Sequence, residues 1–146
     1  MRISFILNGE RREIEVDPGE KLLDLLRRLG CKGVKTGCRK GECGSCTVIV
    51  DGKPVRSCLI FAPQIDGKEV WTIEGVDHPI KDTLLEEGAV QCGFCIPGIV
   101  MTVKALLDEN PAPTDEDIKD ALKGNLCRCT GYIQQIEAVK RVVKKS

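Results

Sequence analysis

Eight of the nine cysteines in this chain fall into two sets of four with unlike spacings, and thiolates in sets of four predict bound metal. The first set is a C-x4-C-x2-C run followed by a distant fourth cysteine, comprising Cys38, Cys43, Cys46 and Cys58. The second set is a C-x2-C pair and a C-x-C pair separated by 31 residues, comprising Cys92, Cys95, Cys127 and Cys129. Only Cys31 is left over, and we expect it to pack as a small apolar residue.

The spacing of the first set is typical of a plant-type [2Fe–2S] site. The five-residue step from Cys38 to Cys43 fits poorly with the paired knuckles of a zinc loop. Gly37, Gly41 and Gly44 lie in the same loop, and we expect them to adopt positive φ values and turn backbone N–H groups toward the sulfurs. The nearby Lys32, Lys35, Arg39 and Lys40 are interpreted as a solvated face of the loop.

The spacing of the second set fits a structural zinc as well as it fits an iron–sulfur cluster. Its context favours the cluster, because one pair directly precedes a predicted helix and the other pair lies between two predicted helices. A cluster there would join short helices whose apolar core is thin.

Composition excludes several classes of function. The chain has 22 basic and 22 acidic residues with no net charge and few aromatic side chains, so nothing argues for nucleic acid as a partner. No apolar stretch approaches the roughly 18 residues that a membrane span requires. An odd number of cysteines without a secretory leader predicts free thiols in a reducing, cytoplasmic compartment.

The first half of the 146 residues has the alternation of strands. Residues 2–7 and 11–16 flank Asn8-Gly9, which predicts a hairpin. Residues 20–29 predict a helix ending at Gly30. Residues 47–50 and 55–60 flank a turn at Asp51-Gly52, and residues 69–73 predict a last strand.

The second half has helical periodicity throughout. We expect helices over residues 81–88, from Pro97 to Asn110, from Thr114 to a cap at Gly124, and from Tyr132 onward with Ile136, Val139 and Val143 on its apolar face. The predicted class is therefore α+β, with one domain at residues 1–76 and a second, all-α domain at residues 77–146.

Four ordered motifs resemble the iron–sulfur subunit of the molybdenum hydroxylases, the xanthine dehydrogenase, aldehyde oxidoreductase and carbon monoxide dehydrogenase family. They are GCRKGECGSCTV at residues 37–48, SCL at 57–59, QCGFCIPG at 91–98 and GNLCRCTGY at 124–132. Ser45 and Ile96 stand where alanine and threonine are commoner, and neither is a ligand.

The resemblance implies a β-grasp ferredoxin-like [2Fe–2S] domain followed by a four-helix bundle that binds a second [2Fe–2S] cluster. It also implies that electrons flow from molybdopterin (Mo) on a large catalytic subunit through the C-terminal and then the N-terminal cluster to FAD on a medium subunit. Gln91 and Cys129 would contact the molybdopterin. The assembly implied is a heterotrimer or a dimer of heterotrimers.

The chain carries no recognisable catalytic motif of its own, so we expect it to transfer electrons without turning over a substrate. Two other functions stay open from the residues. One is a free-standing two-cluster carrier or redox sensor, and the other is a zinc-stabilised adaptor with no electron chemistry.

Overall fold

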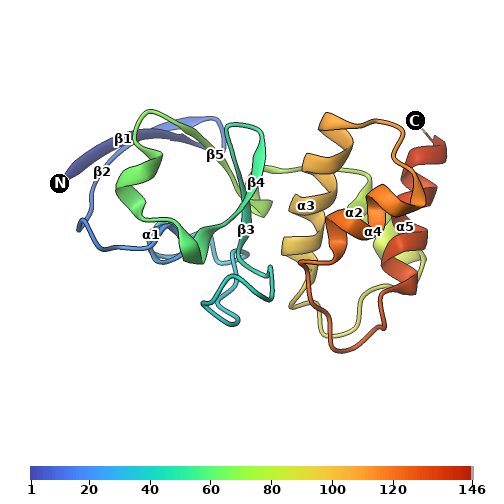
Figure 1. Ribbon diagram of the computed structural model, residues 1–146. Helices are drawn as coiled ribbons and strands as arrows, with labels where there is room; N and C mark the ends of the chain where they lie inside the picture. Colours follow the sequence, from blue (N-terminus) through green and yellow to red (C-terminus); the bar gives the residue numbers. More distant parts are fainter. Residues whose placement is uncertain (146) are drawn as a thin grey trace.

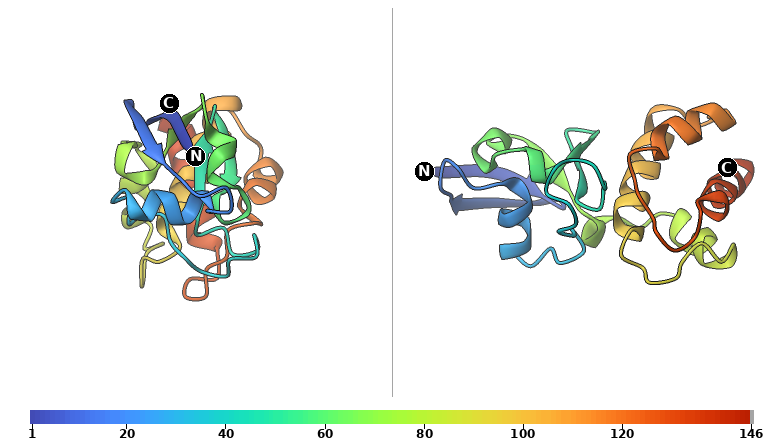
Figure 2. Two further views of the ribbon diagram at one scale, coloured as in Figure 1. Left: turned by 90° about the vertical axis from the view of Figure 1, so that its left-hand side faces the viewer. Right: turned by 60° about the horizontal axis from the view of Figure 1, so that its bottom comes forward.

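The structure is a computed structural model that describes residues 1–145 of the chain, with side chains to residue 144. Two lobes lie side by side, a sheet with one α-helix on the N-terminal side and a group of helices on the C-terminal side (Figures 1 and 2). The α+β class is therefore confirmed. The predicted boundary between residues 76 and 77 stays a prediction, and Ser146 lies outside the described residues.

The sheet has five strands, β1 (Arg2–Leu7), β2 (Glu10–Glu15), β3 (Thr47–Val50), β4 (Lys53–Arg56) and β5 (Glu69–Trp71), in the order β2-β1-β5-β3-β4. β1 and β5 are parallel and the other pairs are antiparallel. Both predicted hairpins are present, and both residues of each turn have positive φ, from 48° at Asp51 to 87° at Gly9. This is the backbone that lets two-residue turns follow the twist of the strands.

Helix α1 (Leu22–Arg28) packs its leucines on the sheet. It ends as predicted at Gly30, because the N–H groups of Gly30 and Cys31 donate to the carbonyls of Arg27 and Leu26. The strand expected over residues 55–60 is wrong beyond Arg56. A 3-10 turn, η1 (Ser57–Leu59), replaces it and turns Cys58 toward the other cysteines of its set. Two further 3-10 turns, η2 (Ala62–Ile65) and η3 (Ile73–Gly75), flank β5.

Four α-helices follow in the described C-terminal part, α2 (Ile80–Glu86), α3 (Ile96–Glu109), α4 (Asp115–Leu122) and α5 (Ile133–Lys145). Pro97 lies in the first turn of α3, and Thr114 and Asp117 cap α4 reciprocally, both as predicted. Gly124 is not the left-handed cap that was expected, since its φ is not positive. A Cβ there would instead overlap the guanidinium of Arg56.

The two lobes share a face of the sheet. Successive residues of β3 alternate between two cores: Val48 packs with α1, whereas Ile49 joins the apolar core of α2 to α5. Helix α3 therefore covers the side of β3 that α1 leaves open (Figure 1). The cysteine loops of both lobes emerge near this contact.

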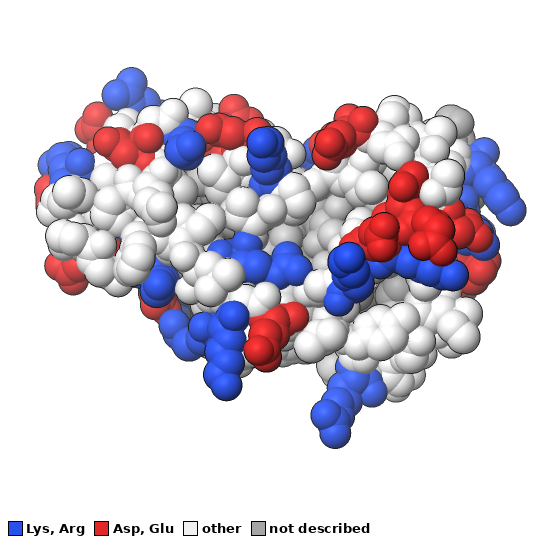
Figure 3. All heavy atoms as spheres, in the orientation of Figure 1, with Lys and Arg blue, Asp and Glu red and all other residues white. Residues whose placement is uncertain are grey.

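No helix in residues 1–145 combines the length and the apolar character that crossing a bilayer requires. On the face drawn in Figure 3, basic and acidic side chains are interspersed over both lobes.

Candidate iron–sulfur sites

The N-terminal set lies in the loop between α1 and β3, with its fourth member on η1. Cys46 and Cys58 are buried, and Cys38 and Cys43 are half-buried at the mouth of the loop. The four thiols meet as two hydrogen-bonded pairs, Cys38 with Cys43 and Cys46 with Cys58. Burial and then the contact with Cys46 raise the pKa of Cys58 to about 11.

Backbone N–H groups of this loop point toward the sulfur atoms of Cys38 and Cys43. The N–H groups of Lys40, Glu42 and Cys43 each lie 3.3 Å from the Cys38 Sγ atom, and that of Ser45 lies 3.5 Å from the Cys43 Sγ atom. These donors, led by those of Cys43 and Lys40, lower the pKa of Cys38 to about 6. The loop is thus built to receive a negatively charged group bound through sulfur.

Two of the three predicted loop glycines have positive φ, 80° at Gly41 and 74° at Gly44. Gly37 does not, and the expectation for it was wrong. Position 37 requires glycine for lack of space, because a Cβ atom there would lie 2.6 Å from the Cys43 Sγ atom. Arg39 also adopts positive φ, at 60°, which the sequence did not indicate.

Arg39 is not a free cation on the loop face. Its guanidinium binds both carboxylate oxygens of Asp24 on α1, at 2.7 and 3.2 Å, and thereby lowers the pKa of Asp24. No ion pair is found for Lys32, Lys35 or Lys40 within residues 1–145, which agrees with a solvated face.

The C-terminal set also forms two pairs. Cys92 and Cys129 are exposed with their Sγ atoms 3.6 Å apart, and Cys95 and Cys127 are buried and hydrogen-bonded to each other. Burial, together with the contact to Cys127, raises the pKa of Cys95 to about 12. The Cys92 contact raises the pKa of Cys129.

Side chains surround Cys127 closely, and sequence reasoning missed all of them. The Thr130 hydroxyl lies 3.2 Å and the Gln135 Nε2 atom 3.8 Å from the Cys127 Sγ atom, while the Cys127 N–H donates to the Tyr132 hydroxyl at 2.8 Å. Burial raises the pKa of Cys127, but hydrogen bonds from Thr130 and Cys95 outweigh it and hold the pKa below its usual value.

Gln91 and Cys129, predicted together as a contact to a cofactor, are brought together here. The Gln91 Nε2 atom donates to the Cys129 carbonyl oxygen at 3.0 Å, and both residues are exposed. Both side chains are therefore accessible from outside the lobe.

The two cysteine sites adjoin each other. The Leu126 N–H donates to the Cys43 carbonyl at 2.8 Å, and Asn125 Nδ2 to the Gly44 carbonyl at 3.2 Å. A cavity of about 340 Å³ is lined by residues from both sites, among them Cys43 and all four cysteines of the C-terminal set.

The donor sets fit two-iron clusters. A [2Fe–2S] cluster takes two protein ligands on each iron, and each set supplies two pairs of thiols with N–H or O–H donors to the sulfurs. A single zinc takes all four ligands around one ion. In each set the four thiols lie as two pairs instead.

Two family models match the chain in succession. Residues 5–70 match a 2Fe-2S iron-sulfur cluster binding domain and residues 72–140 match a [2Fe-2S] binding domain.

Curated relatives match over nearly the whole chain. The chain is 52% identical to the nicotinate dehydrogenase small FeS subunit of Eubacterium barkeri, with 98% of this chain and 95% of the relative covered. It is 43% identical to the xanthine dehydrogenase iron-sulfur-binding subunit of Escherichia coli O157:H7, with 94% and 91% covered.

Among solved structures, quinoline 2-oxidoreductase from Pseudomonas putida 86 matches with a TM-score of 0.94 and 42% identity, covering 99% of this chain and 94% of that one. The paired thiols and these relatives lead to one conclusion: the chain belongs to the iron–sulfur subunits of the molybdenum hydroxylases, the non-catalytic subunits that pass electrons through [2Fe–2S] clusters.

Proposed function

We propose that the exposed end of the C-terminal site receives electrons from the molybdopterin of a large catalytic subunit, and that the N-terminal site delivers them to FAD on a medium subunit. Cys92, Cys95, Cys127 and Cys129 hold one cluster in this proposal, and Cys38, Cys43, Cys46 and Cys58 hold the other. When bound, each cluster supplies one-electron redox chemistry. The protein holds the sulfur ligands, orders the two sites and adjusts their potentials.

The observation that carries this proposal is the hydrogen bond from the Leu126 N–H to the Cys43 carbonyl. Cys43 is a ligand of one site, and Leu126 directly precedes Cys127, a ligand of the other. One hydrogen bond and a short stretch of backbone therefore connect the two sites. Two centres joined so closely are suited to consecutive electron transfer.

The direction of transfer is supported by exposure. At the C-terminal site, Cys92 and Cys129 are exposed beside Gln91, whereas Cys95 and Cys127 are buried in the core of the helical lobe. We assign the exposed pair and Gln91 to the molybdopterin contact. The buried pair includes Cys127, which directly follows Leu126 and its hydrogen bond to the Cys43 carbonyl, so we assign this pair to the path toward the N-terminal site.

The finer architecture is proposed on the same basis. A sheet in the order β2-β1-β5-β3-β4 with α1 across it supports a β-grasp domain, and α2 to α5 support a four-helix bundle. We place their boundary near residue 76. Ile49, from the N-terminal side of that boundary, packs in the helical core, so the two domains are expected to unfold cooperatively.

The proposed partners are the molybdopterin and FAD subunits, in a cytoplasmic heterotrimer or dimer of heterotrimers. Relatives named for nicotinate, nicotine and xanthine support an N-heteroaromatic substrate for the whole complex. In this account the substrate is selected by the large subunit.

A matched pair of variants tests the order of transfer in the purified complex. With nicotinate as the probe substrate, a Cys46→Ser complex should reduce its C-terminal cluster but leave FAD oxidised, as seen by freeze-quench EPR and flavin absorbance. A Cys127→Ser complex should leave both the N-terminal cluster and FAD oxidised. Dithionite should reduce the remaining cluster in both variants, which shows that it is present. Rapid FAD reduction by nicotinate in Cys127→Ser would overturn the proposed order.

A further inference from the structure

The buried face of α5 contains an unexpected polar side chain. Its buried positions follow helical spacing and are apolar except for the first: Gln135, Ala138, Val139 and Val142. The buried face of α5 is therefore shifted by about one residue from the face predicted from Ile136, Val139 and Val143. Ile136 and Val143 are only partly buried. Gln135 is 1% exposed, and a buried amide is costly unless its polar atoms are paired.

The nitrogen of Gln135 is fully engaged and its oxygen is not. The Nε2 atom lies 3.2 Å from the Ala89 carbonyl, 2.5 Å from the Thr130 hydroxyl and 3.8 Å from the Cys127 Sγ atom. The Ala89 carbonyl can only accept, which fixes the nitrogen on this side. The Oε1 atom is buried and has no hydrogen-bond partner among the described residues.

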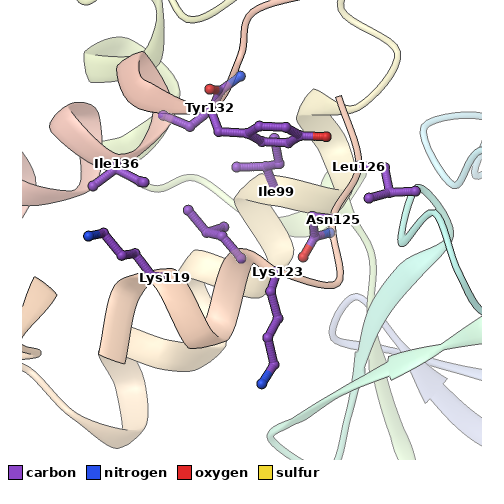
Figure 4. Close-up of a pocket in the computed structure, with 9 residues that line it drawn as sticks. Ile99, Lys119, Lys123, Asn125, Leu126, Tyr132 and Ile136 are labelled. Atoms are coloured by element: carbon purple, nitrogen blue, oxygen red, sulfur yellow. The ribbon is translucent and has the colours of Figure 1, made fainter. Parts of the chain in front are cut away.

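Packing does not account for the amide. Gln135 also borders a cavity of about 250 Å³ between α3, α4 and α5 (Figure 4). Ile99, Leu122, Leu126, Tyr132 and Ile136 line most of this cavity, with Lys119, Lys123 and Asn125 completing it, and the ring of Tyr132 extends across it in the close-up. A lining that is mostly apolar does not require an amide at position 135. The amide of Gln135 is explained instead by the polar contacts of its Nε2 atom, which lie on the side away from the cavity.

Those contacts converge on one sulfur. Because the Thr130 hydroxyl accepts from Gln135, its own hydrogen is directed to the Cys127 Sγ atom 3.2 Å away. At the N-terminal site, by contrast, no side chain other than cysteine is found donating to a cysteine sulfur within residues 1–145. There the donors are backbone N–H groups.

We propose that Gln135, acting through Thr130, sets the reduction potential of the C-terminal cluster by orienting the Thr130 hydroxyl so that it donates to the Cys127 sulfur. The inference rests on the proposed role of Cys127 as a ligand. Reduction adds one electron to the centre, with no bond broken and no proton moved, and the added negative charge lies partly on the ligand sulfurs. Donors aimed at sulfur stabilise the reduced form, so they raise the potential. Gln135 and Thr130 are positioning residues.

The test is an EPR-monitored redox titration of the purified complex. Gln135→Leu and Thr130→Val should each lower the C-terminal potential, so that the ratio of reduced to oxidised cluster at a fixed ambient potential falls about tenfold, which equals 59 mV for a one-electron couple. Thr130→Ser keeps the hydroxyl and should retain the wild-type potential. The N-terminal cluster should not shift in any of these variants.

Gln134→Leu is the matched control, because it makes the same change one residue away on α5, where no contact with a cysteine sulfur is found among the described residues. It should leave both potentials unchanged. An unchanged C-terminal potential in Gln135→Leu, or an equal shift in Gln134→Leu, would overturn the inference. If Gln135→Leu loses its cluster, the Thr130 variants decide. A wild-type potential in Thr130→Val would overturn the inference. A lowered potential in Thr130→Val, together with a wild-type potential in Thr130→Ser, would support it. A wild-type complex without two clusters would instead refute the proposed function.

Discussion

The N-terminal cysteines receive their hydrogen bonds from the backbone of a single loop, whereas the C-terminal cysteines lie between helices and receive them from side chains as well. Three N–H groups surround Cys38, and Thr130 and Gln135 surround Cys127. Backbone donors depend on the conformation of the loop and survive most substitutions. Side-chain donors can be changed one at a time. We therefore expect the C-terminal potential to respond more readily to single substitutions.

The two sites also differ in how they are held. The N-terminal loop is closed on its own lobe by the Arg39–Asp24 ion pair, while the C-terminal loop of residues 124–126 is bound to the opposite lobe through Arg56, Gly44 and Cys43. The bonds to Gly44 and Cys43 hold both cysteine loops, whereas the bond from Arg56 on β4 holds only the C-terminal loop, which therefore depends on the N-terminal lobe for part of its position. The following changes test this asymmetry.

Removing one ligand should have the largest effect. Cys127→Ser should abolish the C-terminal EPR signal, lower the iron content from about four to about two per chain, and destabilise the helical lobe. The N-terminal signal should persist, because its donors lie within its own loop. EPR and iron analysis of the purified complex measure both. Loss of both signals together would show that the sites do not form separately.

Gly98→Ala should disturb the contact between the lobes. A Cβ on Gly98, in the first turn of α3, would overlap the Gly44 carbonyl oxygen, so the loop or the helix must shift. Overpacking of this kind costs about 1–3 kcal/mol in the free energy of unfolding. Denaturant unfolding checks the loss, with Gly19→Ala as control, since no atom lies within 4 Å of a Cβ there. Equal stability of the two variants would contradict close packing at this contact.

Arg56→Met tests the connection from β4 to the C-terminal loop. The guanidinium donates to the Gly124 carbonyl at 2.8 Å and to the Thr47 hydroxyl at 3.0 Å. Its loss should cost about 1–2 kcal/mol in the free energy of unfolding and alter the C-terminal EPR line shape more than the N-terminal one. Arg11→Met, which removes an exposed guanidinium on β2, should do neither. A change confined to the N-terminal signal would argue against the proposed dependence.

Asp24→Asn should have the smallest effect. The pair with Arg39 is exposed, so its removal should cost less than about 1 kcal/mol. Arg39 lowers the pKa of Asp24, so the contribution is complete above the unfolded pKa of about 3.9 and is lost as pH falls through the lowered folded value. Urea midpoints should therefore differ from wild type by the same amount from pH 5 to pH 8. A difference in urea midpoint that vanishes by pH 6 would contradict this assignment. Asp120→Asn on α4 is the control.

Local patterns predicted much of the fold. Both hairpins, the cap at Gly30 and the capping box of α4 depend on residues close in sequence, and all are present. The sulfur sets were also predicted from spacing. The loop glycines were only partly understood, because Gly37 is required by a contact with Cys43 rather than by its own backbone angles.

The features that were missed depend on residues far apart in the chain. Gly124 looked like a helix cap until Arg56, 68 residues away, was seen to occupy the space beside it. Gln135 was not singled out, since the apolar positions Ile136, Val139 and Val143 indicated a face turned by one residue. Its neighbours Ala89 and Cys127 come from separate loops. Periodicity cannot identify such partners.

Quantifying metal and spins in the reduced complex tests the central claim most directly. Two sets of four thiolates should yield about four irons and four acid-labile sulfides per copy of this chain, with two distinguishable [2Fe–2S] EPR signals of about one spin each. Tightly bound zinc in place of iron, or a single cluster signal in a fully loaded sample, would contradict it.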